Sequence, residues 1–153
     1  MLHSDDKLEA VQQVAESLGE LKDSVVFVGG AVIGLYVDDP AAEEVRPTKD
    51  VDITAEITTI GKLEHLRQEL TKRGFRQFHE DQVICRFRLD NLRVDVMSTH
   101  PVGWAPANRW FEPGFKRLEI KKINNTSIKV LSLPFYLAAK FESHYNRGEM
   151  TRE

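Results

Sequence analysis

Cysteine is nearly absent from this sequence of 153 residues, in which Cys85 stands alone. A single thiol cannot form a disulfide within the chain or build a zinc site from several cysteines. Long apolar runs are missing too, because no stretch approaches the ~18 uncharged apolar residues that a membrane helix requires. The first eight residues carry Asp5 and Asp6 where a signal peptide would carry basic residues. We therefore expect a cytoplasmic protein that is neither secreted nor membrane-spanning.

A marked excess of one charge is also lacking. The chain has 21 basic and 24 acidic residues and a formal net charge of -3, so no overall field attracts nucleic acid or an anionic membrane. The stretch 109–129 is the one local candidate, since its basic side chains interleave with aromatic ones. It fits single-stranded RNA binding, or more simply a polar strand face beside a small aromatic cluster.

The histidines show no paired spacing typical of a transition-metal site: they are His3, His65, His79, His100 and His144.

What is present is the composition of one folded domain over residues 1–153, with 41% hydrophobic and 29% charged residues. Apolar residues at steps of three and four predict helices, and period-two runs predict strands. Helices are expected over 5–22, 31–36, 61–73 and 133–147, and strands over 25–28, 50–54, 83–89, 92–98, 117–123 and 127–131. A surface loop is expected over 38–49, an ordered loop over 99–115 and a hairpin turn at Asp90-Asn91. This order predicts an α+β (mixed α/β) domain with a small mixed β-sheet flanked by helices.

A glycine pair follows the first predicted strand, in the segment VFVGG. Gly29 and Gly30 let the backbone approach a ligand closely, and the N–H groups of the helix expected after them attract phosphate. The pair is thus a candidate cradle for a triphosphate. A tight turn without any ligand is the simpler alternative, because glycine pairs are common in turns.

Acidic side chains alternate with apolar ones in two later predicted strands. In DVDI, Val51 and Ile53 are expected to face the core, which leaves Asp50 and Asp52 together on the other face. Two neighbouring carboxylates repel each other unless a cation lies between them, and Mg²⁺ prefers such oxygen ligands. Asp95 has the same pattern in RVDVM and reaches this face if the two strands are neighbours. Three carboxylates suggest two metal ions, although a solvated strand face, with Arg93 paired to Asp95, is the alternative.

These pieces resemble the nucleotidyltransferase superfamily with the DNA polymerase beta type of fold, whose signature joins Gly-Gly or Gly-Ser to Asp-apolar-Asp-apolar. VFVGG and DVDI match that signature. With the later segment SLPFYLAAKFESHYNRG, the order of motifs over residues 20–150 is similar to the AbiEii branch, known as toxin components of toxin–antitoxin and abortive-infection systems. The resemblance implies that Gly29, Gly30, Asp50, Asp52 and Asp95 carry the nucleotide and metal site. It also implies that Lys140, in the later motif, binds nucleotide.

The function expected from this resemblance is Mg²⁺-dependent transfer of a nucleoside monophosphate from an NTP to a hydroxyl acceptor, with Asp50, Asp52 and Asp95 as catalytic residues and ligands of a two-metal site. An RNA, a tRNA or a protein side chain is the expected acceptor, and an antitoxin protein is an expected partner.

The insertion over 38–47 lengthens the usual spacer, and relatives usually continue beyond the point that corresponds to Glu153. We therefore expect a truncated or minimal member. The alternative is a non-catalytic module that senses nucleotide or binds a partner with the same fold.

Overall fold

The computed structural model describes the backbone of residues 2–36 and 50–152, and the side chains of residues 8–36 and 50–145. The helices are α1 (Leu2–Leu18), α2 (Ile60–Lys72), α3 (Phe111–Gly114) and α4 (Leu133–Arg152), with 3-10 helices η1 (Gly19–Ser24) and η2 (Gly30–Leu35). The strands are β1 (Val25–Val28), β2 (Asp50–Ala55), β3 (Arg86–Leu89), β4 (Leu92–Ser98), β5 (Leu118–Ile123) and β6 (Thr126–Leu131). The loop expected over 38–49 lies outside the described residues.

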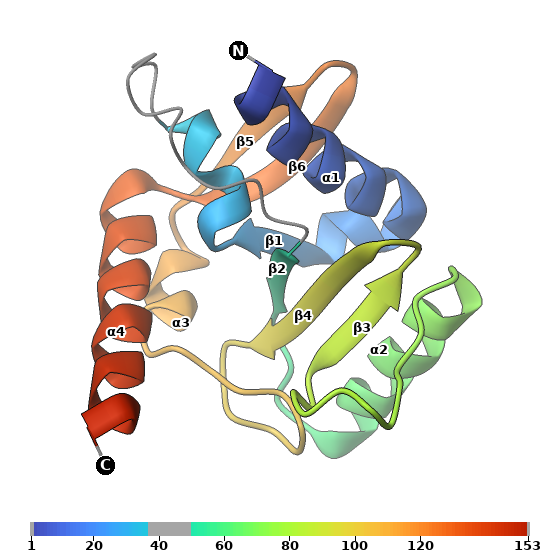
Figure 1. Cartoon of the computed structure of the whole chain (residues 1–153), viewed down its shortest axis with the longest axis vertical. Coiled ribbons are helices and arrows are strands. Elements are labelled where there is room, and N and C mark those ends of the chain that lie inside the picture. The colour runs from blue at the N-terminus through green and yellow to red at the C-terminus, as the bar shows by residue number, and fades with distance from the viewer. Residues whose placement is uncertain (1, 37–49, 153) are drawn as a thin grey trace.

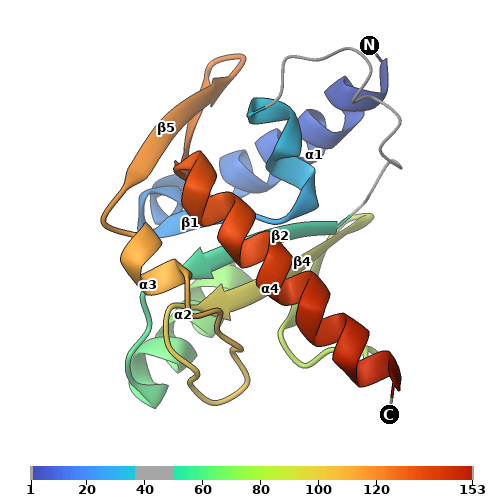
Figure 2. The same ribbon diagram turned by 90° about the vertical axis from the view of Figure 1, so that its left-hand side faces the viewer.

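The six strands form one mixed sheet in the order β3-β4-β2-β1-β6-β5. β2 is central: it pairs antiparallel with β1 and parallel with β4. Figures 1 and 2 show the sheet between α2 on one side and α4 on the other. The predicted α+β fold with a small mixed sheet is therefore confirmed. Within the described residues, no helix combines the length and apolar character needed to cross a membrane.

One face of the sheet contributes to a continuous apolar core. Val51, Ile53, Val94 and Val96 are almost completely buried, as their period-two spacing predicted. The apolar faces of α1 and α2 join the same core, with residues spaced by three and four positions: Val11, Val14 and Leu18 from α1, and Leu63, Leu66 and Leu70 from α2. Residues at alternate positions of β2 and β4 are thereby directed to the opposite face. That face carries Asp50, Asp52 and Asp95.

Several expected boundaries are wrong, and glycine explains two of them. The first α-helix ends at Leu18 instead of residue 22, because Gly19 takes a left-handed conformation with φ +56°. The segment expected as a helix over 31–36 is the 3-10 helix η2, which contains two glycines and therefore has little intrinsic preference for an α-helix. In contrast, α4 continues through Gly148, since one interior glycine costs a helix only ~1 kcal/mol.

The predicted hairpin is confirmed, with β3 and β4 antiparallel around Asp90-Asn91. Asp90 adopts a positive φ of 52°, which aspartate tolerates better than most residues. The first strand of the hairpin, β3, begins at Arg86 instead of residue 83. The hairpin register places Arg86 opposite Asp95 and Arg88 opposite Arg93.

Candidate active site

The glycine turn and the second acidic residue of β2 lie against each other. Val28, the last residue of β1, is the register partner of Asp52, so the chain leaves β1 directly beside that carboxylate. Gly29 has φ 79° and ψ -172°, a conformation that is essentially restricted to glycine. A Cβ atom at Gly29 would overlap with Asp52 Oδ2 and lie 3.0 Å from Asp52 Cγ. The glycine is therefore required both by the backbone conformation and by the carboxylate.

The third acidic residue lies beside the second. Asp52 and Asp95 are register partners on the parallel strands β2 and β4, and neighbouring strands are about 4.8 Å apart. Both side chains are half-buried. Asp50 lies two positions before Asp52 on the same face, and its register partner is Arg93. The structure thus brings the three predicted acidic residues onto one face, with Asp52 and Asp95 as direct neighbours.

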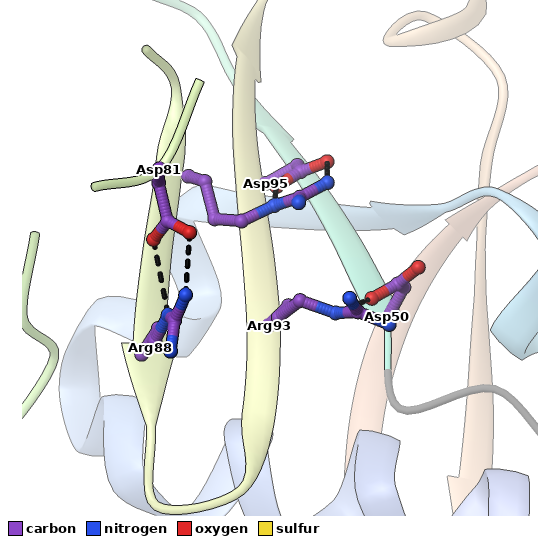
Figure 3. Close-up of polar contacts among 6 residues, drawn as sticks. Asp50, Asp81, Arg88, Arg93 and Asp95 are labelled. Atoms are coloured by element: carbon purple, nitrogen blue, oxygen red, sulfur yellow. Dashed lines mark hydrogen bonds and ion pairs between the residues drawn. The ribbon is translucent and has the colours of Figure 1, made fainter. Parts of the chain in front are cut away.

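Three arginines pair with acidic residues on and beside this face (Figure 3). Arg93 Nε lies 2.5 Å from Asp50 Oδ1. Arg86 donates from Nε to Asp95 Oδ1 at 2.9 Å and from Nη2 to Asp95 Oδ2 at 3.2 Å. The alternative in which Arg93 pairs with Asp95 is therefore wrong, because Arg93 lies opposite Asp50 across the parallel strands and Asp95 is held by Arg86 instead.

Arg86 escaped the sequence interpretation, although the sequence held a signal for it. A two-residue turn at Asp90-Asn91 fixes the hairpin register, and counting back from that turn sets Arg86 opposite Asp95. A cross-strand pair of opposite charge is then expected.

The three carboxylates offer oxygen ligands for Mg²⁺ next to a turn that has no side chain of its own. In the part of the chain that the structure describes, however, no three acidic, histidine or cysteine side chains are already arranged to hold a metal ion. The guanidinium group of Arg86 pairs with Asp95, and that of Arg93 pairs with Asp50. The residue types fit Mg²⁺, and the two-metal site stays a prediction.

Helix α4 brings a cation and a phenol to the glycine turn. Lys140 is exposed, and its Nζ lies 3.9 Å from the position that a Cβ on Gly30 would take. Tyr136, one helical turn earlier, donates a hydrogen bond from its hydroxyl to the Gly29 carbonyl oxygen at 2.8 Å. The structure therefore gathers Gly29, Gly30, Asp52 and Lys140 at one place, whereas the sequence had placed Lys140 there only through a family resemblance.

Tyr136 is the other residue that sequence reasoning missed. Its ring lies 4.4 Å from that of Tyr36, whose hydroxyl donates to the Leu131 carbonyl oxygen at 2.6 Å. Burial, and then the charge of Asp52, raise the pKa of Tyr136 to about 12, so the phenol keeps its proton and remains a donor. The available signal was its spacing of four residues from Lys140, which puts the two on one helix face. Tyr136 fixes the turn between the nucleotide-binding candidates.

The turn is not continued by a long helix, contrary to expectation. η2 is a 3-10 helix of six residues, and the poorer hydrogen-bond geometry of a short 3-10 helix does not align its peptide dipoles as a long α-helix does. The positive charge nearest to Gly30 within the described contacts is the ammonium group of Lys140. A phosphate at this turn would therefore meet the Lys140 ammonium group and the glycine N–H groups.

Cys85 lies beside the acidic face and is expected to react slowly. It is 8% exposed, and burial followed by the charges of Asp95 and Asp52 raises its pKa to about 11. Because the thiol pKa is higher in the folded protein than in the unfolded chain, the folded state favours the neutral thiol. The free energy of unfolding is therefore unaffected by this group below pH ~9 and falls as the pH rises towards 11, where the unfolded chain loses the proton first. At pH 8, iodoacetamide should modify the native protein about 100-fold more slowly than the urea-unfolded chain. Equal rates would contradict this assignment.

Comparisons with known proteins bear on the fold. No family model matches the sequence, and no curated protein matches it. Among solved structures, the chain is similar to the crystal structure of an antigenic nucleotidyltransferase-like protein from Paracoccidioides brasiliensis, with a TM-score of 0.59 and 21% identity. The match covers 95% of this chain and 69% of that one. At this level of identity the likeness concerns architecture alone, and the chain described here therefore has a nucleotidyltransferase-like fold.

Proposed function

We propose that this chain is a nucleotidyltransferase, which uses Mg²⁺ to transfer a nucleoside monophosphate from an NTP to a hydroxyl acceptor. One observation carries the proposal: the Asp52 carboxylate packs against Gly29, with Asp95 beside it in register and Lys140 Nζ next to Gly30. A close-approach turn, a cation and adjacent carboxylates are what transfer from a triphosphate requires. The nucleotidyltransferase-like fold supports the same activity.

In this proposal the chain's own residues position the triphosphate. Gly29 and Gly30 admit the triphosphate against the backbone, and the Lys140 ammonium neutralises phosphate charge. Tyr136 donates a hydrogen bond to the Gly29 carbonyl oxygen and so stabilises the conformation of the turn. Asp50, Asp52 and Asp95 would hold Mg²⁺, which when bound helps to activate the attacking oxygen and neutralises the leaving pyrophosphate.

The acceptor and the partner are proposed from the resemblance to AbiEii proteins over residues 20–150. An RNA, a tRNA or a protein hydroxyl in the cytoplasm is the proposed acceptor, and an antitoxin protein is the proposed partner. The basic stretch 109–129 gives limited support for an RNA acceptor, because Arg109 pairs with Glu142 and Lys129 Nζ donates to the Asp23 carbonyl oxygen. Arg109 and Lys129 of this stretch therefore already form contacts within the protein.

A second candidate function is a nucleotide-sensing module without catalysis. The observation that favours it is the pairing of Arg86 with Asp95 and of Arg93 with Asp50, in which a guanidinium group neutralises a carboxylate that the enzyme would need for metal. Such a protein would bind an NTP at the glycine turn and release it unchanged.

Incubation with each of the four α-³²P-labelled NTPs and total RNA distinguishes the two candidates. We expect Mg²⁺-dependent transfer of label to RNA or to protein, abolished by EDTA, since the carboxylates alone would repel the triphosphate. Nucleotide binding measured by equilibrium dialysis without any labelled product would favour the sensing module. Absence of both binding and transfer would contradict the two candidates together.

A further inference from the structure

Arg86 holds the Asp95 carboxylate at both oxygens. The Nε–Oδ1 and Nη2–Oδ2 distances are 2.9 and 3.2 Å, and each side chain is only 20% exposed. The hydrogen bond to Asp95 is the main reason why the pKa of Arg86 is raised above its usual value. A pair so little exposed is weakly screened by salt and water, in contrast to the Arg93–Asp50 pair, whose side chains are 47% and 41% exposed.

This pairing opposes the entry of a free metal ion beside Asp95. The parallel fork of two N–H donors engages both carboxylate oxygens and cancels the charge that would attract a cation. A divalent ion shared between Asp52 and Asp95 would also lie within a few ångströms of the guanidinium, where repulsion is considerable at the effective dielectric constant of a protein surface. A triphosphate changes this balance, because it adds oxygen ligands and several negative charges.

We propose that Arg86 is a positioning residue that makes divalent-metal binding at Asp52 and Asp95 depend on nucleotide. This inference rests on the proposed function. Free metal is held weakly because Arg86 neutralises Asp95, whereas metal and triphosphate together are held well. By thermodynamic linkage, the metal raises the affinity for nucleotide by the same factor as the nucleotide raises the affinity for metal.

The first experiment measures Mn²⁺ binding without nucleotide, from the electron paramagnetic resonance signal of the free ion. In Arg86→Gln we expect the dissociation constant for Mn²⁺ to fall about tenfold, since one positive charge beside the metal is removed. Arg88→Gln is the matched control. Arg88 lies on the same strand and forms the same kind of two-bond pair, at 3.0 and 2.5 Å, with Asp81. We expect no change there, and an affinity in Arg86→Gln that is unaltered or weaker would overturn the proposal.

Two further variants separate charge from damage to the fold. Arg86→Lys keeps the positive charge and should bind Mn²⁺ about as weakly as the native protein; tightening equal to that of Arg86→Gln would contradict a role for charge. Adding Asp95→Asn to Arg86→Gln should remove the tighter binding, because Asp95 is the carboxylate that Arg86 releases. Retained tight binding in that double variant would place the metal elsewhere.

A final measurement compares Mn²⁺ binding with and without nucleotide, first in the native protein. Native protein should bind Mn²⁺ at least tenfold more tightly in the presence of a non-hydrolysable NTP analogue, after correction for Mn²⁺ bound to the free analogue, and Arg86→Gln should lose most of this coupling. Equal affinity for Mn²⁺ with and without the bound analogue in native protein would refute the inference. The proposed function fails separately, if native protein binds no nucleotide and transfers no label, and the nucleotide-free comparison of Arg86→Gln with Arg88→Gln would still report on Arg86.

Discussion

Replacing Asp52 by asparagine is expected to lower nucleotidyl transfer by about 10³-fold, equivalent to ~4 kcal/mol of transition-state stabilisation. The amide has nearly the size of the carboxylate but carries no charge, so it can neither balance Mg²⁺ nor share it with Asp95. Steady-state transfer of label from an NTP measures the loss. Circular dichroism and thermal melting should show an intact fold, because Asp52 is half-buried on the face opposite the apolar core.

The control for this variant is Asp90→Asn. Asp90 is exposed in the β3–β4 turn, has φ 52° and accepts a hydrogen bond from Gln13 Nε2. Asparagine tolerates the left-handed conformation as well as aspartate does, so activity and stability should both stay near their native values. Equal activity in Asp52→Asn and Asp90→Asn would remove Asp52 from the site.

Replacing Gly29 by alanine should impair both stability and transfer. The conformation at φ 79° and ψ -172° costs a residue with a side chain about 1–3 kcal/mol. The new Cβ would also overlap with Asp52 Oδ2, so the Asp52 carboxylate must turn away from the glycine turn. We expect a lower midpoint of urea unfolding and a loss of transfer greater than the lost stability explains, measured at a temperature where the variant is fully folded.

Gly34→Ala provides the matched comparison. Gly34 is exposed in η2, and a Cβ there would meet no atom within 4 Å. Such a change should leave activity intact and stabilise the fold by up to ~1 kcal/mol, because alanine restricts the unfolded chain. A similar response in the two variants would show that the close approach at Gly29 has no importance.

The sequence predicted the strands and one face of the site because the period-two pattern is a local property. Val51, Ile53, Val94 and Val96 had to face the core, and this alone directed Asp52 and Asp95 to the other face. Whether they would be neighbours depended on the pairing of β2 with β4, which is a tertiary contact that no local pattern encodes. The resemblance to nucleotidyltransferases supplied that expectation, and the register of Asp52 with Asp95 agrees with it.

The parts that escaped prediction depend on contacts between distant segments or on weak preferences. The hydrogen bond from Tyr136 to Gly29 joins α4 to the end of β1. The sequence of either segment alone does not predict this contact. The 3-10 geometry of η2 reflects a small difference in backbone free energy, which an apolar pattern of six residues does not reveal. Arg86 was deducible from the turn, but only once the register of the hairpin was taken into account.

The position of α4 in the chain order has a consequence for protein synthesis. The glycine turn and β2 leave the ribosome early, whereas Tyr136 and Lys140 follow every strand of the sheet. A nascent chain that has already paired β2 with β4 still lacks the ammonium group and the phenol that complete the turn. The proposed nucleotide binding is thus expected only after α4 has been synthesised, because a shorter nascent chain would carry the acidic face without Tyr136 and Lys140.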